Sequence, residues 1–381
     1  MRNQNDVAVK LSMHVLSSAT KDSSVILSPA SINSAITMHA AGPGGESVAS
    51  EILSFLRSSS MEELKTIFRE ISSVVFADHS ASGGPKITAA NGLWIEKSLP
   101  VDPKFKDLFE NFFNAVYAPV DFRSKGFVRN IVSYESSAKF MTSETDKIYA
   151  NALYFKGAWK RPFEKYYTKD KDFHLVNGTS VSVPFMTSFD YQYVKAYDGS
   201  KVLRLPYRRG SNDCKPIRKF SMYFYLPDKK YGLYELLEKM GSTPRFVDNH
   251  IPGFRDELEA FRIPKFKISF GFSVTSVLDQ LGMGSISLYH KACVEIDEEG
   301  AEAAAATADD DEGFGLYIEP PKRIDFVADH PFIFLIREDK TGTVLFFGQI
   351  FDPSEICSGS PLEPRSDYWS ESDEDMGSMF W

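Results

Sequence analysis

Cysteine is nearly absent from the 381-residue chain, which contains only Cys214, Cys293 and Cys357. An odd number of cysteines at wide spacing provides neither a disulfide framework nor a paired-cysteine metal or redox site. We therefore expect a reducing compartment, cytoplasmic or nucleocytoplasmic, with the extracellular space as the alternative.

Long apolar runs are also missing. No stretch approaches the roughly 18 apolar residues that are needed to cross a bilayer. The first 18 residues, MRNQNDVAVKLSMHVLSS, lack the apolar run followed by small residues that marks a secretory signal. We expect no signal peptide and no contact with a membrane.

The common signatures of catalysis are absent as well. The sequence has no G-x-S-x-G nucleophile elbow, and no two of its seven histidines have metal-ligand spacing on one helix. The glycines of AGPGGES (residues 41–47) lack the Lys-Ser/Thr of a phosphate loop. The four consecutive acids at residues 309–312 lack the alternating ligands and central glycine of a calcium loop. We expect no enzymatic activity, no metal and no cofactor.

The composition is that of a soluble globular protein with a large core, because 43% of residues are hydrophobic, 25% are charged, and Phe (31) and Tyr (17) are abundant. The net charge of −9 is localised. Residues 295–312 contain nine acids and no Lys or Arg, and residues 354–381 contain seven acids and one base. No concentrated basic face remains, so a nucleic-acid partner is not expected. The acidic tail, residues 354–381, is predicted to be disordered.

Residue periodicity predicts an α+β protein. Val7, Leu11 and Val15 recur at helical spacing near the N-terminus. Strand-like runs dominate after residue 147, and Asn177-Gly178 and Asp198-Gly199 are strong hairpin signals. Helices first and strands later favour α+β over alternating βαβ units. Residues 1–353 are predicted to form one domain, within which residues 123–146 are polar and without clear period.

The most unusual stretch is VEIDEEGAEAAAATADDDEGFGLYI (residues 294–318). Its Glu-Ala run alone is compatible with an exposed alanine-rich helix or spacer. A glycine near the start of the run and strand-like segments on both sides fit that interpretation poorly.

Several motifs in a fixed order carry a resemblance to a known family. EEGAEAAAAT (298–307), FVADHPF (326–332) and FFGQIFDP (346–353) are the strongest. Upstream matches are LSPASI (27–32), NGLWI (91–95), NALYFKGAW (151–159) and YHKACVEIDEEG (289–300). The sequence resembles the serpin family, and within it the plant serpins, over nearly all of residues 1–353.

This resemblance implies a fold, an activity and a partner. The implied serpin fold packs helices on a large mixed sheet A, adds smaller antiparallel sheets, and exposes a reactive-centre loop. A serine or cysteine endopeptidase attacks the loop and forms an acyl-enzyme. The loop then inserts into sheet A as a new strand, and the protease is distorted. The chain would thus be a metastable protease inhibitor and a monomer, not an enzyme.

The resemblance also assigns residues to roles. Ser28, Ser31, Asn151 and His290 would form a buried hydrogen-bond cluster where the sheet opens, and Trp159 would pack where the loop enters. Without the family, His290 is an ordinary core or surface histidine. The loop hinge would comprise Glu298, Glu299, Gly300, Ala301, Glu302, Ala303, Ala304, Ala305, Ala306 and Thr307.

Family spacing places the cleaved bond between Phe314 and Gly315 when counted from the hinge, and between Gly315 and Leu316 when counted back from FVADHPF. The first placement suits a chymotrypsin-like serine protease, and the second suits a papain-like cysteine protease. Neither offers Arg or Lys, which argues against trypsin-like proteases and metacaspases.

Three departures from the family weaken the inhibitory interpretation, and the first two favour an alternative function. Strand alternation puts Asp309 and Asp311 on one face with Ala301, Ala303, Ala305 and Thr307. In the family that face is buried after insertion, and a buried carboxylate needs a partner or a proton. Residues 123–146 are shorter than the family segment, which carries a helix over the sheet. The acidic tail is additional. The alternative is a non-inhibitory serpin-fold binding protein, or a degenerate serpin that is cleaved as a substrate.

Overall fold

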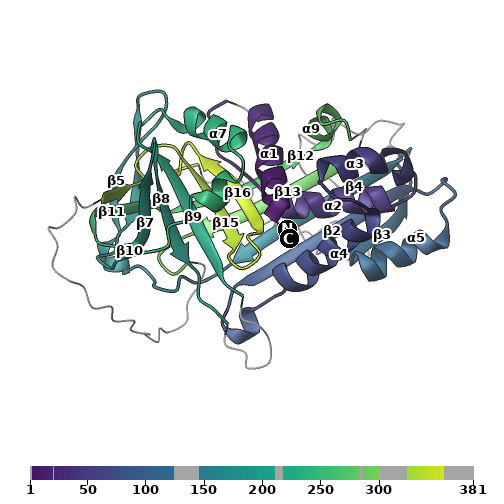
Figure 1. Ribbon diagram of the computed structural model, residues 1–381, viewed down its shortest axis with the longest axis horizontal. Coiled ribbons are helices and arrows are strands. Elements are labelled where there is room, and N and C mark those ends of the chain that lie inside the picture. Colours follow the sequence, from purple (N-terminus) through teal and green to yellow (C-terminus); the bar gives the residue numbers. More distant parts are fainter. Residues whose placement is uncertain are drawn as a thin grey trace, which may run out of the picture.

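The α+β prediction is confirmed by the computed structural model, which describes residues 2–19, 21–123, 146–210, 218–283, 286–300 and 324–355. The sheets and the helices that pack on them are shown in Figure 1. Residues 124–145, residues 301–323 and residues 356–381 lie outside this description, so predictions that concern them remain predictions.

Helices among the first third of the chain begin after Ser28, Ser60 and Asp102, each of which supplies a side-chain cap. The Oγ atom of Ser28 accepts a hydrogen bond from the backbone N–H of Ser31, and Pro29 occupies the first helical position. Asp102 caps its helix in the same way, and it is followed by Pro103. The α-helices are α1 (Arg2–Ser18), α2 (Pro29–Ala41), α3 (Ala49–Phe55), α4 (Met61–Glu70), α5 (Pro103–Asp107), α7 (Leu233–Ser242), α8 (Phe246–Asn249) and α9 (Thr275–Gln280). Short 3₁₀ or π turns are η1 (Gly45–Val48), η2 (Ile71–Val75), η3 (Ser80–Ser82), η4 (Leu108–Phe112) and η6 (Lys165–Tyr167).

A five-stranded mixed sheet forms one half of the molecule. Its strands, in spatial order, are β12 (Phe266–Ser273), β13 (Leu288–Ile296), β4 (Lys147–Lys156), β2 (Lys86–Glu96) and β3 (Ala115–Val120). Two neighbouring pairs are parallel, β13 with β4 and β2 with β3, and the other pairs are antiparallel. This is the mixed sheet that the resemblance implied.

The other half contains two further sheets. An antiparallel seven-stranded sheet has the order β1 (Val25–Leu27), β16 (Val344–Ile350), β15 (Phe332–Glu338), β9 (Phe220–Pro227), β8 (Ser200–Pro206), β7 (Gln192–Tyr197) and β10 (Arg255–Asp256). A four-stranded sheet has the order β14 (Ile324–Val327), β11 (Leu258–Pro264), β6 (Ser180–Met186) and β5 (Lys169–His174). Both predicted hairpins are present, with Gly178 at φ +85° and Gly199 at φ +78°.

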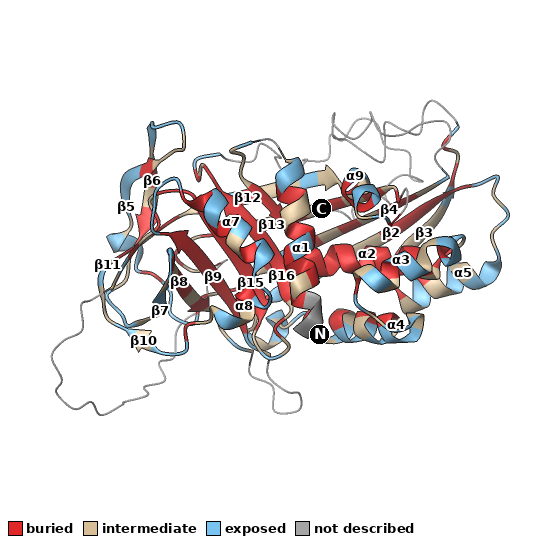
Figure 2. Ribbon diagram, turned by 45° about the horizontal axis from the view of Figure 1, so that its top comes forward, coloured by how far each residue is buried: buried red, intermediate tan, exposed pale blue. Residues whose placement is uncertain are grey.

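The core runs through both halves of the molecule (Figure 2). Helices α2 to α5 lie over one face of the mixed sheet, and every residue of β9, β15 and β16 is buried. Phe155, near the end of β4, packs against Phe220 of β9 and Phe346 of β16 with ring centroids 6.0 and 6.3 Å apart. This packing fixes the end of β4 against the seven-stranded sheet. Among the described helices, none has the length and apolar character that a membrane crossing requires.

Candidate functional site

The seam between β4 and β13 lies in the interior of the mixed sheet. These parallel strands pair from Tyr149 opposite Leu288 to Tyr154 opposite Cys293. The pairing stops there, although β4 continues to Lys156 and β13 to Ile296. The antiparallel partners β2 and β12 continue alongside these end residues. At this end of the seam, β4 and β13 therefore no longer pair with each other, while β4 still pairs with β2 and β13 still pairs with β12.

A buried hydrogen-bond cluster joins the seam to the start of helix α2. The backbone N–H of Ser28 donates to His290 Nε2 at 2.8 Å, so the ring proton lies on Nδ1, which donates to Asn151 Oδ1 at 2.6 Å. Asn151 Nδ2 donates in turn to the carbonyl oxygen of Ser31. The structure thus brings together the four residues that the resemblance had grouped.

Burial keeps this cluster uncharged. His290 is 2% exposed, and burial lowers the pKa of its imidazole to about 3. The ring is neutral at pH 7, which the acceptor role of Nε2 requires. Because His290 belongs to β13 and Asn151 to β4, any strand that enters the seam at this level must break their hydrogen bond.

The hinge segment, residues 297–300, follows β13 and docks on the residues that follow β4. The backbone N–H of Trp159 donates to the carbonyl oxygen of Glu299 at 3.0 Å, and that of Phe163 donates to the carbonyl oxygen of Glu298 at 2.8 Å. The indole Nε1–H of Trp159 donates to the carbonyl oxygen of Asp297 at 2.9 Å. Trp159 is buried and stacks on Tyr207 with ring centroids 4.6 Å apart. Trp159 therefore lies beside the end of the seam at which the pairing of β4 with β13 stops.

Gly300 is required by the geometry of this turn. Its φ is +99°, a conformation that L side chains rarely adopt. A Cβ atom there would lie 2.4 Å from the carbonyl oxygen of Gly157 and 2.6 Å from the backbone nitrogen of Trp159. The Gly300 N–H donates to Asp297 Oδ1 at 2.9 Å, which closes the turn. The chain thus leaves the described hinge in close contact with the end of the seam.

Two lysines pair with the two glutamates of the hinge segment. Glu298, only 4% exposed, accepts from Lys265 Nζ at 2.7 Å and from Thr168 Oγ1 at 2.8 Å. Burial raises the pKa of this carboxyl, but these hydrogen bonds outweigh burial and hold it below its usual value. Glu299, which is less buried, pairs with Lys165 at 2.6 Å, and the hydrogen bond raises the pKa of Lys165.

Sequence reasoning missed these partners of the hinge. Lys265, Lys165 and Thr168 carry no motif, and Thr168 is 130 residues from the carboxylate that it contacts. Asp297 precedes the recognised EEG sequence, and its carboxylate accepts two backbone N–H groups of the turn. A local signal existed only for Asp297, because Asp commonly caps turns in this way.

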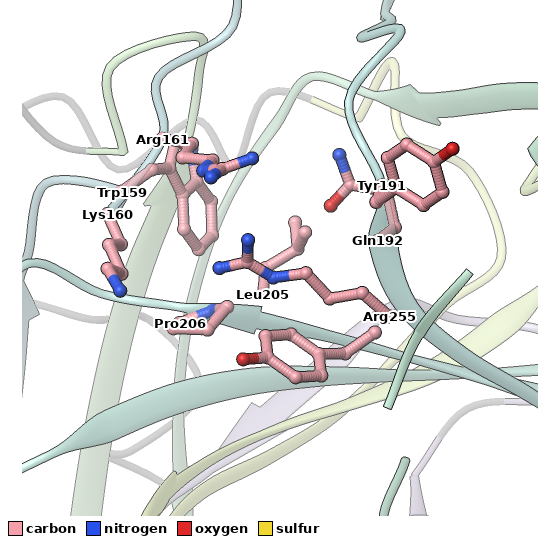
Figure 3. A pocket seen from close by; sticks show the side chains of 9 residues that line it. Trp159, Lys160, Arg161, Tyr191, Gln192, Leu205, Pro206 and Arg255 are labelled. Atoms are coloured by element: carbon pink, nitrogen blue, oxygen red, sulfur yellow. The ribbon is translucent and has the colours of Figure 1, made fainter. Parts of the chain in front are cut away.

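A small pocket lies beside Trp159 (Figure 3). Its volume is about 30 Å³, which holds little more than one water molecule. It is lined by Trp159, Lys160, Arg161, Tyr191, Gln192, Tyr193, Leu205, Pro206 and Arg255. It is too small for a substrate or a cofactor, and the described ranges contain no cluster of His, Cys, Asp or Glu that could hold a metal ion. The polar groups of this region therefore serve to hold the backbone of the hinge in place through hydrogen bonds.

The remaining predicted site residues lie outside the described ranges. These are the rest of the hinge (residues 301–307), the proposed cleavage residues Phe314, Gly315 and Leu316, and the two aspartates Asp309 and Asp311. Their assignments rest on the sequence alone.

Comparisons with known proteins agree with this arrangement. The family model described as "Serpin (serine protease inhibitor)" matches residues 2–353. Serpin-Z1 of Arabidopsis thaliana is 73% identical over 374 residues, covering 94% of this chain and 97% of the relative. A relative called "Probable non-inhibitory serpin-Z5", from the same plant, is 53% identical and covers 93% and 84%.

A solved structure titled "Structure of Arabidopsis AtSerpin1. Native Stressed Conformation" superposes with a TM-score of 0.81 at 44% identity, covering 92% of this chain and 97% of that one. Sequence motifs, sheet topology, hinge geometry and these comparisons agree. The chain therefore belongs to the serpin family of protease inhibitors, and within it to the plant serpin-Z type.

Proposed function

We propose that this chain inhibits an endopeptidase as a suicide substrate. The nucleophile of the protease attacks the carbonyl carbon of Phe314, the amine of Gly315 leaves, and Phe314 remains esterified or thioesterified to the protease. Before water hydrolyses that acyl bond, the loop inserts into the seam between β4 and β13. The covalent chemistry belongs to the protease, and this chain supplies the loop and the seam.

The observation that carries this proposal is the position of the hinge at the unpaired end of a parallel seam. A segment that follows β13 directly and enters the seam beside it must reverse its direction after Gly300. A segment that enters after this reversal would run opposite to both β4 and β13. One parallel pairing would thus be replaced by two antiparallel pairings, which are somewhat more stable per residue. The strand order and hinge together support insertion as an energetically downhill step.

The composition of residues 301–306 supports the same step. Five of these six residues are alanine. Alanine loses no side-chain rotamer entropy on burial and presents little bulk to the strands on either side. A segment with this composition suits a transfer from solvent to the interior of a sheet.

The protease class follows from the residues before the cut. Phe314 favours a chymotrypsin-like serine protease if cleavage precedes Gly315. Cleavage before Leu316 favours a papain-like cysteine protease, with Phe314 one position further from the cut. A reducing cellular compartment for both partners remains part of this proposal.

Incubation with chymotrypsin and with papain tests the mechanism directly. We expect an adduct that survives SDS with at least one of them, because insertion traps the acyl-enzyme. Ala305→Arg should abolish the adduct and leave only clipped chain. In an inserted strand, alternation would turn residue 305 toward the face of the sheet that is buried in the family. Ala306→Arg, which alternation directs to solvent, is the matched control and should retain the adduct. Only clipped product from the wild-type chain would reject inhibition of either protease.

A second candidate function is that of a serpin cleaved as a substrate. Asp309 and Asp311 share the inserting face with Ala305, and a relative 53% identical carries the name "Probable non-inhibitory serpin-Z5". If the two carboxylates stall insertion, Asp309→Ala with Asp311→Ala should raise the ratio of adduct to clipped chain. An unchanged ratio would show that the carboxylates do not obstruct insertion.

A further inference from the structure

Three exposed aromatic side chains, Tyr166, Tyr167 and Phe189, contact one another beside the hinge, and the exposed Tyr191 follows Phe189 two residues later. Tyr166, Tyr167, Phe189 and Tyr191 are 78%, 40%, 78% and 57% exposed. Tyr167 contacts Tyr166 and Phe189 edge to face, with ring centroids 5.4 and 5.1 Å apart. We call these four residues the aromatic patch. They are half of the eight large hydrophobic side chains that are exposed in the described part of the chain.

The aromatic patch comes from two segments far apart in sequence. Tyr166 and Tyr167 belong to η6, and Phe189 and Tyr191 belong to the connection between β6 and β7. Because these rings face solvent, they contribute little to the core, and the fold alone gives no reason for exposing them together. Contiguous exposed apolar surface on a soluble protein commonly marks a contact surface for another macromolecule.

Charged side chains border the aromatic patch. Lys169 Nζ lies 5.1 Å from the centre of the Tyr166 ring, and Arg161 lies 3.9 Å from the carboxylate of Asp190. Lys160 and Arg161 also line the small pocket of which Tyr191 forms one side (Figure 3). Aromatic residues and arginine surrounded by a polar rim are the composition of protein–protein interfaces.

The aromatic patch lies directly beside the hinge, and this position indicates which kind of protein would contact it. Lys165, directly before Tyr166, pairs with the hinge residue Glu299, and Thr168, directly after Tyr167, hydrogen-bonds to Glu298. The patch therefore borders the point at which the chain leaves Gly300. That chain returns at Ile324, the first residue of β14, after 23 residues.

We propose that the aromatic patch is a docking surface for the endopeptidase that cleaves the loop, an inference that rests on the proposed function. Phe314 is 14 residues beyond Gly300, which at full extension reaches about 46 Å. A compact protease of about 220 residues has a diameter of about 45 Å, from the scaling of globule size with length. The tether is therefore no longer than the protease is wide, so the rim of a protease bound at Phe314 can contact the body of the chain beside Gly300 when the loop is less than fully extended.

The partner surface must complement the patch. Its centre should present apolar side chains that cover the rings, and its rim should present charges of both signs that face Lys160, Lys169 and Asp190. Docking of this kind raises the rate at which the protease engages the loop. It does not change how the acyl-enzyme partitions between trapping and hydrolysis, because that step depends on the seam.

The test measures the rate of total loop consumption, adduct plus clipped chain, by chymotrypsin and by papain. Tyr166→Ser with Phe189→Ser should slow consumption by about tenfold for the protease that reacts faster with the wild type. Tyr166→Phe with Phe189→Tyr should restore the rate, since ring area is retained. Tyr231→Ser, a matched change at a side chain 64% exposed outside the patch, should leave it within about twofold.

The two proposals fail in different ways. Clipped product without adduct contradicts inhibition, but the consumption rates still measure docking. Equal rates for the wild type and the Tyr166/Phe189 serine variant would refute docking, whatever the ratio of adduct to clipped chain. Failure of both proteases to consume the wild-type loop would also refute it, because the chosen partner would then not engage the chain.

Discussion

At the scale of single residues, a comparison of two glycines distinguishes two costs of adding a Cβ atom. One is the strain of a positive φ, and the other is steric contact with neighbouring backbone. Gly300 and Gly178 have φ of +99° and +85°, but a Cβ atom meets backbone at 2.4 Å only at Gly300, and nothing lies within 4 Å at Gly178. Gly178→Ala should cost about 1–2 kcal/mol, the penalty for an L residue in the left-handed region. Gly300→Ala should cost clearly more, because the hinge must also move away from Gly157. Urea denaturation of both variants compares them, and equal losses would contradict the contact argument.

His290 gives the stability of the protein a defined dependence on pH. Burial lowers its folded pKa to about 3, whereas the unfolded value is about 6.5. The unfolded chain therefore binds the proton more readily, so stability should be constant above about pH 6.5 and fall as the pH drops toward 3. The slope from one histidine is at most about 1.4 kcal/mol per pH unit. His39, whose pKa is lowered to about 4 by burial and by nearby Lys147, adds to the same slope.

Replacing His290 tests this assignment. His290→Gln should be less stable at pH 7.5, because the hydrogen bonds from Ser28 and to Asn151 are disturbed, and its stability should fall less steeply between pH 6.5 and 4. Urea denaturation at several pH values measures both effects. Parallel curves for the variant and the wild type would show that His290 does not supply the slope.

At the scale of elements, the two glutamates of the hinge segment are held with different strengths, Glu298 more firmly than Glu299. Lys265→Ala leaves the buried Glu298 carboxylate with Thr168 as its remaining side-chain partner, and the expected loss is about 1–3 kcal/mol at pH 7. Because hydrogen bonds depress the pKa of Glu298, this contribution should be present above about pH 4.5 and disappear as the pH falls through the folded value.

Lys165→Ala is the matched change at the exposed hinge pair. Exposed ion pairs are screened by water and contribute little to stability. We therefore expect a much smaller loss than for Lys265→Ala, and one that disappears in high salt. Denaturation at low and high ionic strength distinguishes the two lysines, and a larger loss at Lys165 would reverse this ranking.

Elements whose signals are local could be predicted from the sequence, and those that depend on distant partners could not. The hairpins at Asn177-Gly178 and Asp198-Gly199 and the cap at Asp102 follow from the chemistry of a few neighbouring residues. The parallel pairing of β4 with β13 joins residues 139 apart, such as Asn151 and His290, and periodicity carries no information about it. The resemblance to the family grouped Asn151 and His290 in a buried cluster, but it did not supply the direction or the register of the two strands. It did not supply Lys165 or Lys265, because those contacts depend on how η6 and the connection between β11 and β12 pack beside the hinge.

At the scale of the whole molecule, cleavage of the loop should change stability. If residues after Gly300 enter the seam, each new strand residue adds backbone hydrogen bonds to both β4 and β13, and the melting temperature of the nicked chain should rise by tens of degrees. Differential scanning calorimetry of intact and protease-nicked chain measures this shift. Ala305→Arg is the control, because its nicked form should melt close to the intact protein. A small shift for the nicked wild type would contradict insertion.

The contacts of Trp159 give the protein an internal optical reporter. Its indole is buried against Tyr207 and donates its only hydrogen bond to the carbonyl oxygen of Asp297. Displacement of the hinge removes that acceptor and rearranges the surroundings of the ring, so the fluorescence emission of this one tryptophan should shift when the turn leaves its place. Because the chain contains four tryptophans, stopped-flow recordings of the wild type and of Trp159→Phe would be compared, and the difference would time the first movement of the polypeptide without any attached dye.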